Sequence, residues 1–363
     1  MKKNKNYVDL KDQPVPEGQH LLEVDDLKMY FHTEDGVVRA VDGVSYTLDR
    51  GETLGVVGES GSGKSVTAMT IMGLISMPPG KIEGGDVRYR GRSILEMTEE
   101  EMQHIRGNDI AMIFQDPMTS LNPVYKIGKQ VGEGLRLHRG YSKQEALKRA
   151  TELLDLVGIP EPEKRVNEYP HQFSGGMRQR VMIAMALACD PDILIADEPT
   201  TALDVTIQAQ IIELMQEMQE KNGNAIIMIT HELGVVADMA DKIMVMYAGR
   251  PVEFGTADEI FYESRHPYTW GLIRSIPEQA IDEKKPLTPI HGNPPSLMNL
   301  PQGCVFSPRC PYATDKCRKQ RPERVVTESG HYSACHYSGD PEFLKNAPET
   351  SRTRKDSKKG GEA

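Results

Sequence analysis

Features that mark membrane-spanning, exported or nucleic-acid-binding proteins are scarce in this 363-residue sequence. No apolar run approaches the roughly 18–20 residues that a membrane-spanning helix requires. The net charge of -10 argues against nucleic-acid binding, which normally needs a basic surface. No apolar segment follows the basic residues at the N-terminus, so we expect no signal peptide. Five cysteines without an export signal indicate a reducing compartment, and we expect a cytosolic protein.

A glycine-rich motif at 58–65, GESGSGKS, matches the pattern G-x-x-x-x-G-K-[ST] in full. An apolar stretch that reads as a buried strand precedes it (53–57), and a helical stretch follows it (66–74). In this context the loop's N–H groups and the helix N-terminus favour phosphate oxygens, whereas a chance glycine-rich turn would lack both flanking elements. We expect the lysine to reach the phosphates and the last serine to ligate Mg²⁺. The expected nucleotide contacts are Gly58, Ser60, Gly61, Ser62, Gly63, Lys64 and Ser65.

Two adjacent carboxylates, Asp197 and Glu198, follow the apolar run 193–196. Structural acid pairs are usually solvated in loops, whereas these two end a strand that reads as buried. We therefore expect Asp197 to hold Mg²⁺, through water, and Glu198 to orient or deprotonate the attacking water.

Two further polar residues end apolar strands of the expected sheet. Gln115 follows 110–114, and His231 follows 225–229 and Thr230. Ligands bind at the carboxyl ends of strands in open α/β sheets, so both side chains are candidates for the same site. For His231 the alternative is an ordinary structural histidine, and Gln115 alone is a weak signal.

The segments around these motifs predict further structure. Alternating residues from 21 to 48 indicate antiparallel strands, with turns at 34–36 and at Asp42-Gly43. Phe31, or alternatively Tyr30, could stack on adenine there, although either could be an ordinary strand aromatic. Residues 121–175 read as a helical insertion, after which Ser174-Gly175-Gly176 opens a helix as an N-cap or an anion-binding turn.

Four cysteines, at 304, 310, 317 and 335, fall in a C-x5-C-x6-C-x17-C arrangement near the C-terminus. Clustered thiols in a reducing compartment indicate a metal more than disulfides. The C-x2-C pairs of a typical zinc site are missing, and zinc, another metal centre or free thiols stay open at this point. Cys189, alone in an apolar helix, is expected in the core.

Together these motifs resemble the ATP-binding subunit of an ABC transporter over residues 21–260. The motifs follow the family's order: 58–65, Gln115, 174–176, 193–198 and His231, and Ala202-Leu203-Asp204 is similar to its D-loop. The resemblance implies nucleotide contacts by Asp204 and by Ser174, Gly175 and Gly176, and Mg²⁺ contact by Gln115. It also implies that two cassettes pair head to tail, so that Lys64 and Ser65 face Ser174 and Gly176 of the other cassette.

The sequence is most similar to the oligopeptide/dipeptide permease branch of that family. Three stretches carry this likeness: Phe173-Ser174-Gly175-Gly176-Met177, the run 114–123, and His266-Pro267-Tyr268-Thr269 with Ser275-Ile276-Pro277. In that branch the region of the four cysteines resembles one that holds a [4Fe–4S] cluster, whose ligands would be Cys304, Cys310, Cys317 and Cys335.

The resemblance implies an α/β P-loop NTPase cassette with a RecA-like core, an antiparallel β subdomain and a helical subdomain. We expect a flexible N-terminus (1–20), the ATPase domain (21–260), a permease-type C-terminal region with the cysteine site (261–340) and a disordered tail (341–363).

The implied function is an ATPase that drives import of di- or oligopeptides, peripheral on the cytoplasmic face of the membrane. Its cofactors would be ATP, Mg²⁺ and the cluster. Its partners would be a second, related cassette subunit, two membrane permease subunits and a substrate-binding protein. Nickel or another small solute is an alternative cargo, and a cassette ATPase acting on ribosomes or nucleic acid is a more distant alternative.

Overall fold

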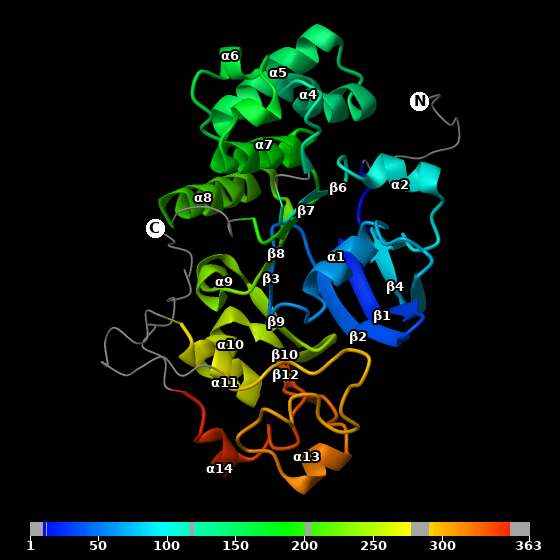
Figure 1. The fold of residues 1–363 in the computed structure, drawn as a ribbon, viewed down its shortest axis with the longest axis vertical. Helices are drawn as coiled ribbons and strands as arrows, with labels where there is room; N and C mark the ends of the chain where they lie inside the picture. The colour runs from blue at the N-terminus through cyan, green and yellow to red at the C-terminus, as the bar shows by residue number, and fades with distance from the viewer. Residues whose placement is uncertain (1–9, 12, 117–119, 200–204, 277–289, 349–363) are drawn as a thin grey trace.

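The computed structural model describes residues 10–11, 13–116, 120–199, 205–276 and 290–348. The described chain forms two β-sheets, a layer of helices at one end and a C-terminal region at the other (Figure 1). None of the helices in these ranges has the length and apolar character needed to cross a membrane. The expected α/β architecture with an antiparallel β part and a helical part is confirmed.

The larger sheet has eight strands in the order β11-β12-β10-β9-β3-β8-β7-β6. Its five strands from β9 to β6 are parallel, and each of the three central ones is buried along its whole length. Parallel strands end at one edge of a sheet, which brings the residues after β3, β6, β7 and β8 together. The strand bounds are β3 Thr53–Val57, β6 Ile110–Ile113, β7 Ile193–Asp197, β8 Ala225–Thr230, β9 Lys242–Tyr247, β10 Arg250–Thr256, β11 Val325–Val326 and β12 Tyr332–Ser333.

The smaller sheet is antiparallel, in the order β2-β1-β4-β5, with β1 Leu22–Thr33, β2 Gly36–Leu48, β4 Gly80–Tyr89 and β5 Arg92–Ser93. The predicted turn at Asp42-Gly43 is wrong, because β2 runs through it without a break. The pairing of β1 with β2 shifts register near Asp26, where Asp26 and Gly43 both have positive φ, so the irregularity is a bulge. Asp42 instead accepts hydrogen bonds from Tyr30 and Arg250.

Helices α4, α5 and α6 fill the predicted helical insertion, and α7, which α4 and α5 contact, joins them to the main sheet. The α5 helix begins with a capping box between Ser142 and Glu145 and buries the apolar face predicted from its spacing. The helix bounds in the cassette are α1 Lys64–Ile71, α2 Glu99–Ile105, α4 Ile127–His138, α5 Lys143–Leu156, α6 Pro162–Arg165, the short 3₁₀ helix Pro170–Gln172, α7 Gly175–Leu187, α8 Val205–Asn222 and α9 Leu233–Met239.

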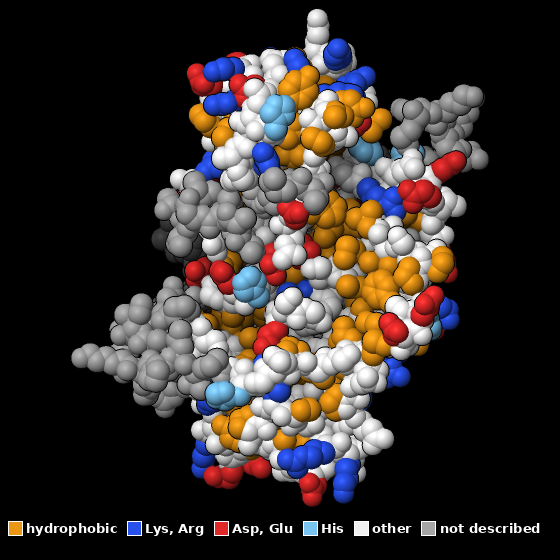
Figure 2. All heavy atoms as spheres, viewed as in Figure 1, with side chains coloured by type: hydrophobic (Ala, Val, Ile, Leu, Met, Phe, Trp, Pro, Cys, Tyr) orange, Lys and Arg blue, Asp and Glu red, His pale blue; other side chains and the backbone are white. Residues whose placement is uncertain are grey.

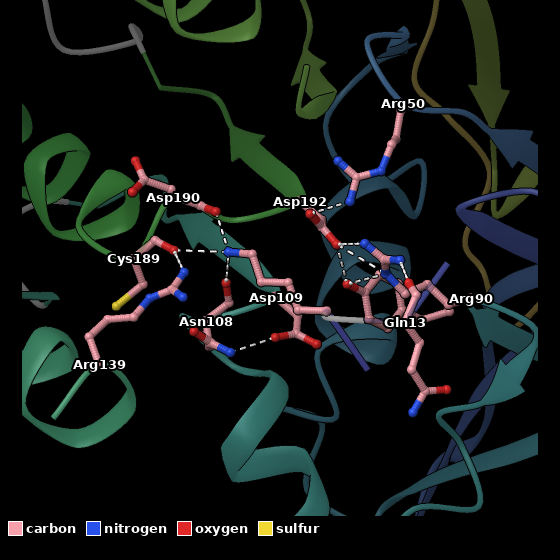
Figure 3. Close-up of polar contacts among 11 residues, drawn as sticks. Gln13, Arg50, Arg90, Asn108, Asp109, Arg139, Cys189, Asp190 and Asp192 are labelled. Carbon is pink, nitrogen blue, oxygen red and sulfur yellow. Dashed lines mark hydrogen bonds and ion pairs between the residues drawn. The ribbon is translucent and has the colours of Figure 1, made fainter. Parts of the chain in front are cut away.

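The expected flexibility of residues 1–20 stays a prediction, but Leu10 and Lys11 in this lead-in contact the cassette. Leu10 is buried, and the Lys11 ammonium donates hydrogen bonds to the carbonyls of Asn108 at 3.1 Å and Cys189 at 3.0 Å, and to that of Asp190 (Figure 3). Asn108 lies just before β6, and Cys189 and Asp190 lie just before β7. The lead-in therefore covers the start of both strands.

Asp192, the residue before β7, is the centre of a buried polar network (Figure 3). Its carboxylate accepts hydrogen bonds from Tyr89 Oη at 2.6 Å, from Arg90 Nη2 at 2.5 Å and from Arg50 Nη2 at 2.7 Å. Burial alone would raise the pKa of Asp192, but the bonds from Tyr89 and Arg90 hold it below its ordinary value. The network ties the smaller sheet to the strand that delivers Asp197.

The C-terminal region shares the cassette's main sheet, because β12 pairs antiparallel with β10. Buried Glu253 of β10 reinforces this junction by accepting hydrogen bonds from the backbone N–H groups of Arg265 and His266, and its Oε1 lies 3.1 Å from His331 Nε2. The region's helices are α10 Ala257–Tyr262, α11 Pro267–Arg274, α13 Asp315–Lys319 and α14 Pro341–Leu344.

The part of the expected tail (341–363) that the structure describes is ordered. Residues 341–344 form α14, and the Phe343 ring packs against Trp270, Tyr312 and Tyr337 with centroids 5.3–5.5 Å apart. The apolar ring explains the difference, because it docks an otherwise polar stretch on the C-terminal region. Residues 349–363 lie outside the described part of the chain.

Candidate functional site

The loop between β3 and α1 has the conformation that its glycines permit. Gly58 and Gly63 have φ values of 152° and 101°. A Cβ on Gly58 would lie 2.2 Å from the Met246 carbonyl oxygen, and one on Gly63 would lie 2.3 Å from that of Ala40. No larger residue fits either position, so the backbone of the loop can close over a phosphate chain.

Lys64 opens α1 and folds back over the loop. Its ammonium donates hydrogen bonds to the carbonyl oxygens of Gly58 at 2.6 Å and Glu59 at 3.1 Å, and the residue is 5% exposed. Burial lowers the pKa of Lys64, while Glu198, Asp197 and Glu59 act to raise it. The cation is therefore held among acids at the mouth of the loop, where phosphate oxygens could replace the two carbonyls as its partners.

Asp197, the last residue of β7, meets the first turn of α1. The Ser65 hydroxyl donates a hydrogen bond of 2.9 Å to Asp197 Oδ1. Asp197 is 4% exposed, and burial raises its pKa, with a further contribution from Glu198. A buried carboxylate beside a hydroxyl is a donor set that suits Mg²⁺, which is commonly held by one or two protein oxygens together with water and substrate phosphates.

Glu198 lies where the carboxyl ends of β6, β7 and β8 come together. Its Oε2 accepts a hydrogen bond of 2.9 Å from Gln115 Nε2, and its Oε1 lies 3.3 Å from His231 Nδ1. Its backbone has φ 47°, in the left-handed region, and its N–H donates to the Ile229 carbonyl. Figure 2 shows acidic and histidine side chains near the middle of this face, between the helical layer and the C-terminal region.

The other predicted nucleotide contacts are not gathered at this point. Phe31 is half-buried in β1, opposite Val38 of β2 and Gly80 of β4. Ser174 caps α7 by accepting from the Met177 N–H at 3.3 Å, and Ser174 and Gly175 are exposed. Asp204 lies outside the described residues, so its role stays a prediction, as does stacking of adenine on Phe31.

The sequence matches two protein families in succession. Residues 41–201 match the ABC transporter family, and residues 252–317 match the C-terminal region of oligopeptide/dipeptide transporters. The chain is 58% identical over 312 residues to the oligopeptide transport ATP-binding protein OppD of Bacillus subtilis, covering 86% of this chain and 87% of that protein. It belongs to the oligopeptide/dipeptide branch of the ABC transporter ATP-binding proteins.

Other members and a solved cassette agree with this assignment. The dipeptide transport ATP-binding protein DppD of Escherichia coli is 52% identical over 88% of this chain and 97% of its own length. The dimeric structure of the ATP-binding cassette MJ0796 in a post-hydrolysis state, bound to ADP and Pi, superposes with a TM-score of 0.60 at 28% identity. It covers 65% of this chain and 98% of MJ0796, so this ATPase carries a complete cassette and a C-terminal extension.

The four clustered cysteines of this ABC protein line one cavity, together with aromatic residues that include Phe306. All four are free thiols, and burial raises the pKa of Cys304, of Cys310 to about 11 and of Cys335 to about 12. Among the residues that the structure describes, no group of three or more His, Cys, Asp or Glu side chains is arranged to hold a metal ion. The four thiols thus line one cavity, and the kind of metal they would hold stays a prediction.

Sequence reasoning missed one contact at the nucleotide loop. Glu59 occupies a variable position of the motif, yet its carboxylate is held by Arg309, a residue 250 positions away. The only sequence signal was an acid in the phosphate loop, where its own charge would repel phosphate unless a cation offset it.

Proposed function

We propose that this chain is the ATP-hydrolysing subunit of an importer that takes up di- and oligopeptides across the cytoplasmic membrane. The observation that carries the proposal is the convergence of Lys64, Ser65, Asp197 and Glu198 at one sheet edge, in a chain whose C-terminal region matches peptide transporters. The close relatives are named for oligopeptide and dipeptide transport, which favours peptides over the nickel alternative.

In the proposed mechanism, the phosphate loop binds the β- and γ-phosphates through its N–H groups and Lys64. Ser65 and Asp197 would hold Mg²⁺, with Gln115 as a further oxygen ligand, and the ion would neutralise charge on the phosphates. Because Lys64 now contacts two loop carbonyls, nucleotide binding would exchange those neutral acceptors for charged oxygens.

Glu198 is the residue proposed to orient the attacking water and accept its proton. Gln115 and His231 each contact one of its two oxygens, so both position the carboxylate, and His231 could also donate to the γ-phosphate. The side chain of Glu198 is 12% exposed, which limits competition from bulk water while leaving access for one reactant.

A second cassette would complete the site. Ser174 and Gly175 are exposed at the N-terminus of α7, a position from which a helix N-terminus can bind an anion on another molecule. The dimer of MJ0796 with ADP and Pi supports such a pairing. We expect a related second subunit, two permease subunits and a substrate-binding protein as partners, with this chain peripheral on the cytoplasmic face.

The cysteine cavity is proposed to hold a [4Fe–4S] cluster. The support is chemical: four free thiols line one cavity, and four thiolates are the ligand set of such a cluster. Each iron of a cluster takes its own cysteine, so the thiols need not surround a single ion. The cluster would cross-link α13, which carries Cys317, to the loops that carry Cys304, Cys310 and Cys335. Iron and sulfide assays after anaerobic purification test this, and the absence of iron refutes it.

The deciding experiment is uptake in cells that carry Glu198→Gln, with labelled dipeptides, oligopeptides and nickel offered in parallel. Loss of peptide uptake alone supports the peptide importer. Loss of nickel uptake alone would support the transport ATPase but show that nickel, not peptide, is the transported solute. Glu342→Gln, a substitution at an exposed position of α14, is the matched control and should transport normally. Unimpaired uptake of every solute would contradict the transport function, and ribosome association would then be measured.

A further inference from the structure

The C-terminal region reaches into the nucleotide site through one buried side chain. Arg309 Nη1 lies 2.5 Å from Glu59 Oε2, and Arg309 Nη2 lies 3.0 Å from Glu59 Oε1, so the pair is bidentate. The Arg309 side chain is 4% exposed and that of Glu59 is 29% exposed. A bidentate pair with one buried partner fixes orientation as well as distance, unlike a solvent-exposed ion pair.

Glu59 has every polar group engaged. Its N–H donates a 2.8 Å hydrogen bond to Tyr268 Oη, its carbonyl accepts from Lys64, and its carboxylate binds Arg309. The carbonyl also accepts from the Ser62 N–H at 3.2 Å, so two of the four partners, Tyr268 and Arg309, come from beyond the cassette's last strand, β10. The second residue of the phosphate loop is therefore positioned by the C-terminal region on one side and by the phosphate-binding lysine on the other.

The same contacts connect the loop to the cysteine cavity. Phe306 lines that cavity and packs against Tyr247 and Tyr268, with ring centroids 5.2 Å and 5.3 Å apart. The Arg309 guanidinium carbon lies 5.8 Å from the centroid of the Tyr247 ring. Arg309 also directly precedes Cys310 in the sequence. A change in packing around the thiols would thus act on Tyr268 and Arg309, the two residues of the C-terminal region that bind Glu59.

Charge makes the contact relevant to ATP. A free carboxylate in a phosphate loop would repel the incoming nucleotide, whereas the Arg309 cation offsets it and is itself kept fully charged, because its bonds to Glu59 raise its pKa. Arg309 also donates to the carbonyls of Ile290 and His291, so the cation is fixed from several directions.

From this geometry we infer that Arg309 is a positioning residue of the ATP site, through which the packing of the cysteine-lined region sets the affinity of the phosphate loop for MgATP. This inference rests on the proposed function as an ATPase. It assigns the C-terminal region a role in nucleotide binding that is separate from any contact with cargo or permease.

The test measures MgATP affinity and steady-state hydrolysis of the full chain. Arg309→Gln should weaken MgATP binding on the order of tenfold, since it removes a bidentate charged pair and leaves Glu59 to repel phosphate. Turnover at saturating ATP should stay within about twofold, because Arg309 touches none of the groups around Glu198. A merely structural role would lower the active fraction instead, leaving the KM for ATP unchanged.

Arg318→Gln, in the same region but in an exposed pair with Asp315, is the matched control and should bind MgATP normally. Glu59→Gln keeps an oxygen acceptor for Arg309 while removing the charge that repels phosphate, so it should bind MgATP at least as tightly as wild type. It serves as the deciding variant if Arg309→Gln fails to fold.

Equal MgATP affinity in folded Arg309→Gln and wild type would overturn the inference, as would weaker binding by Glu59→Gln. Failure of wild type itself to bind MgATP would instead refute the ATPase function. The two failures are therefore distinguishable in one titration series.

Discussion

Asp192 is a residue at which the structure predicts a large loss of stability without any contact with nucleotide. Asp192→Ala would leave Arg90, whose side chain is 3% exposed, with its charge buried and its main partner gone. Breaking a buried ion pair by removing one partner typically costs about 3–5 kcal/mol. The exposed pair of Asp315 with Arg318 provides the comparison, since Asp315→Ala should cost no more than about 0.5 kcal/mol.

Thermal unfolding followed by circular dichroism would measure both variants, and we expect Asp192→Ala to lower the melting midpoint by about 5 °C or more. The pH dependence follows from the lowered pKa of Asp192. The carboxylate's contribution is complete above its unfolded-state pKa of about 3.9 and is lost as pH falls through the lower folded-state pKa. The gap between wild type and variant should therefore be constant at neutral pH and narrow below about pH 4. A midpoint shift no larger than that of Asp315→Ala would refute the reasoning.

Three further predictions concern the nucleotide site. Lys64→Ala should weaken MgATP binding at least tenfold in a fluorescent-nucleotide titration, and unchanged affinity would count against the loop assignment. Gly63→Ala should impair binding far more than Gly61→Ala, because an added Cβ meets the Ala40 carbonyl at 2.3 Å in the first case and nothing within 4 Å in the second; similar effects would show that the loop is differently shaped. Glu198→Gln should retain MgATP yet lose phosphate release in a malachite-green assay, and residual hydrolysis near wild type would remove Glu198 from its role.

The sequence predicted the nucleotide site well because its determinants are local. A phosphate loop needs its own glycines and the strand and helix beside it, all within 53–71. Gln115, Glu198 and His231 each directly follow or closely follow an apolar strand, and parallel strands deliver such residues to one edge. Their convergence could therefore be predicted from the three strands. The left-handed backbone conformation of Glu198 could not be predicted in this way.

The errors and omissions arise where distant segments decide the outcome. Asp42-Gly43 has turn chemistry, but pairing with β1 on one side keeps it within a strand as a bulge. Phe343 sits in a polar stretch, and the rings that hold it are far away in sequence. The Arg309–Glu59 pair spans 250 positions, and the residues of a single sequence carry no signal for a pairing over such a distance.

The strand β12 has a consequence for how the protein can be divided. It covers the outer side of β10, and beyond it the sheet ends in β11, only two residues long, which offers little backbone for pairing with another molecule. A chain cut after residue 260 would lose this cover, which spans two residues of β10, and expose the backbone of Glu253 and Phe254. Such a fragment would carry every nucleotide motif yet leave backbone groups of β10 unpaired at the sheet edge, where a strand of another molecule could pair with them.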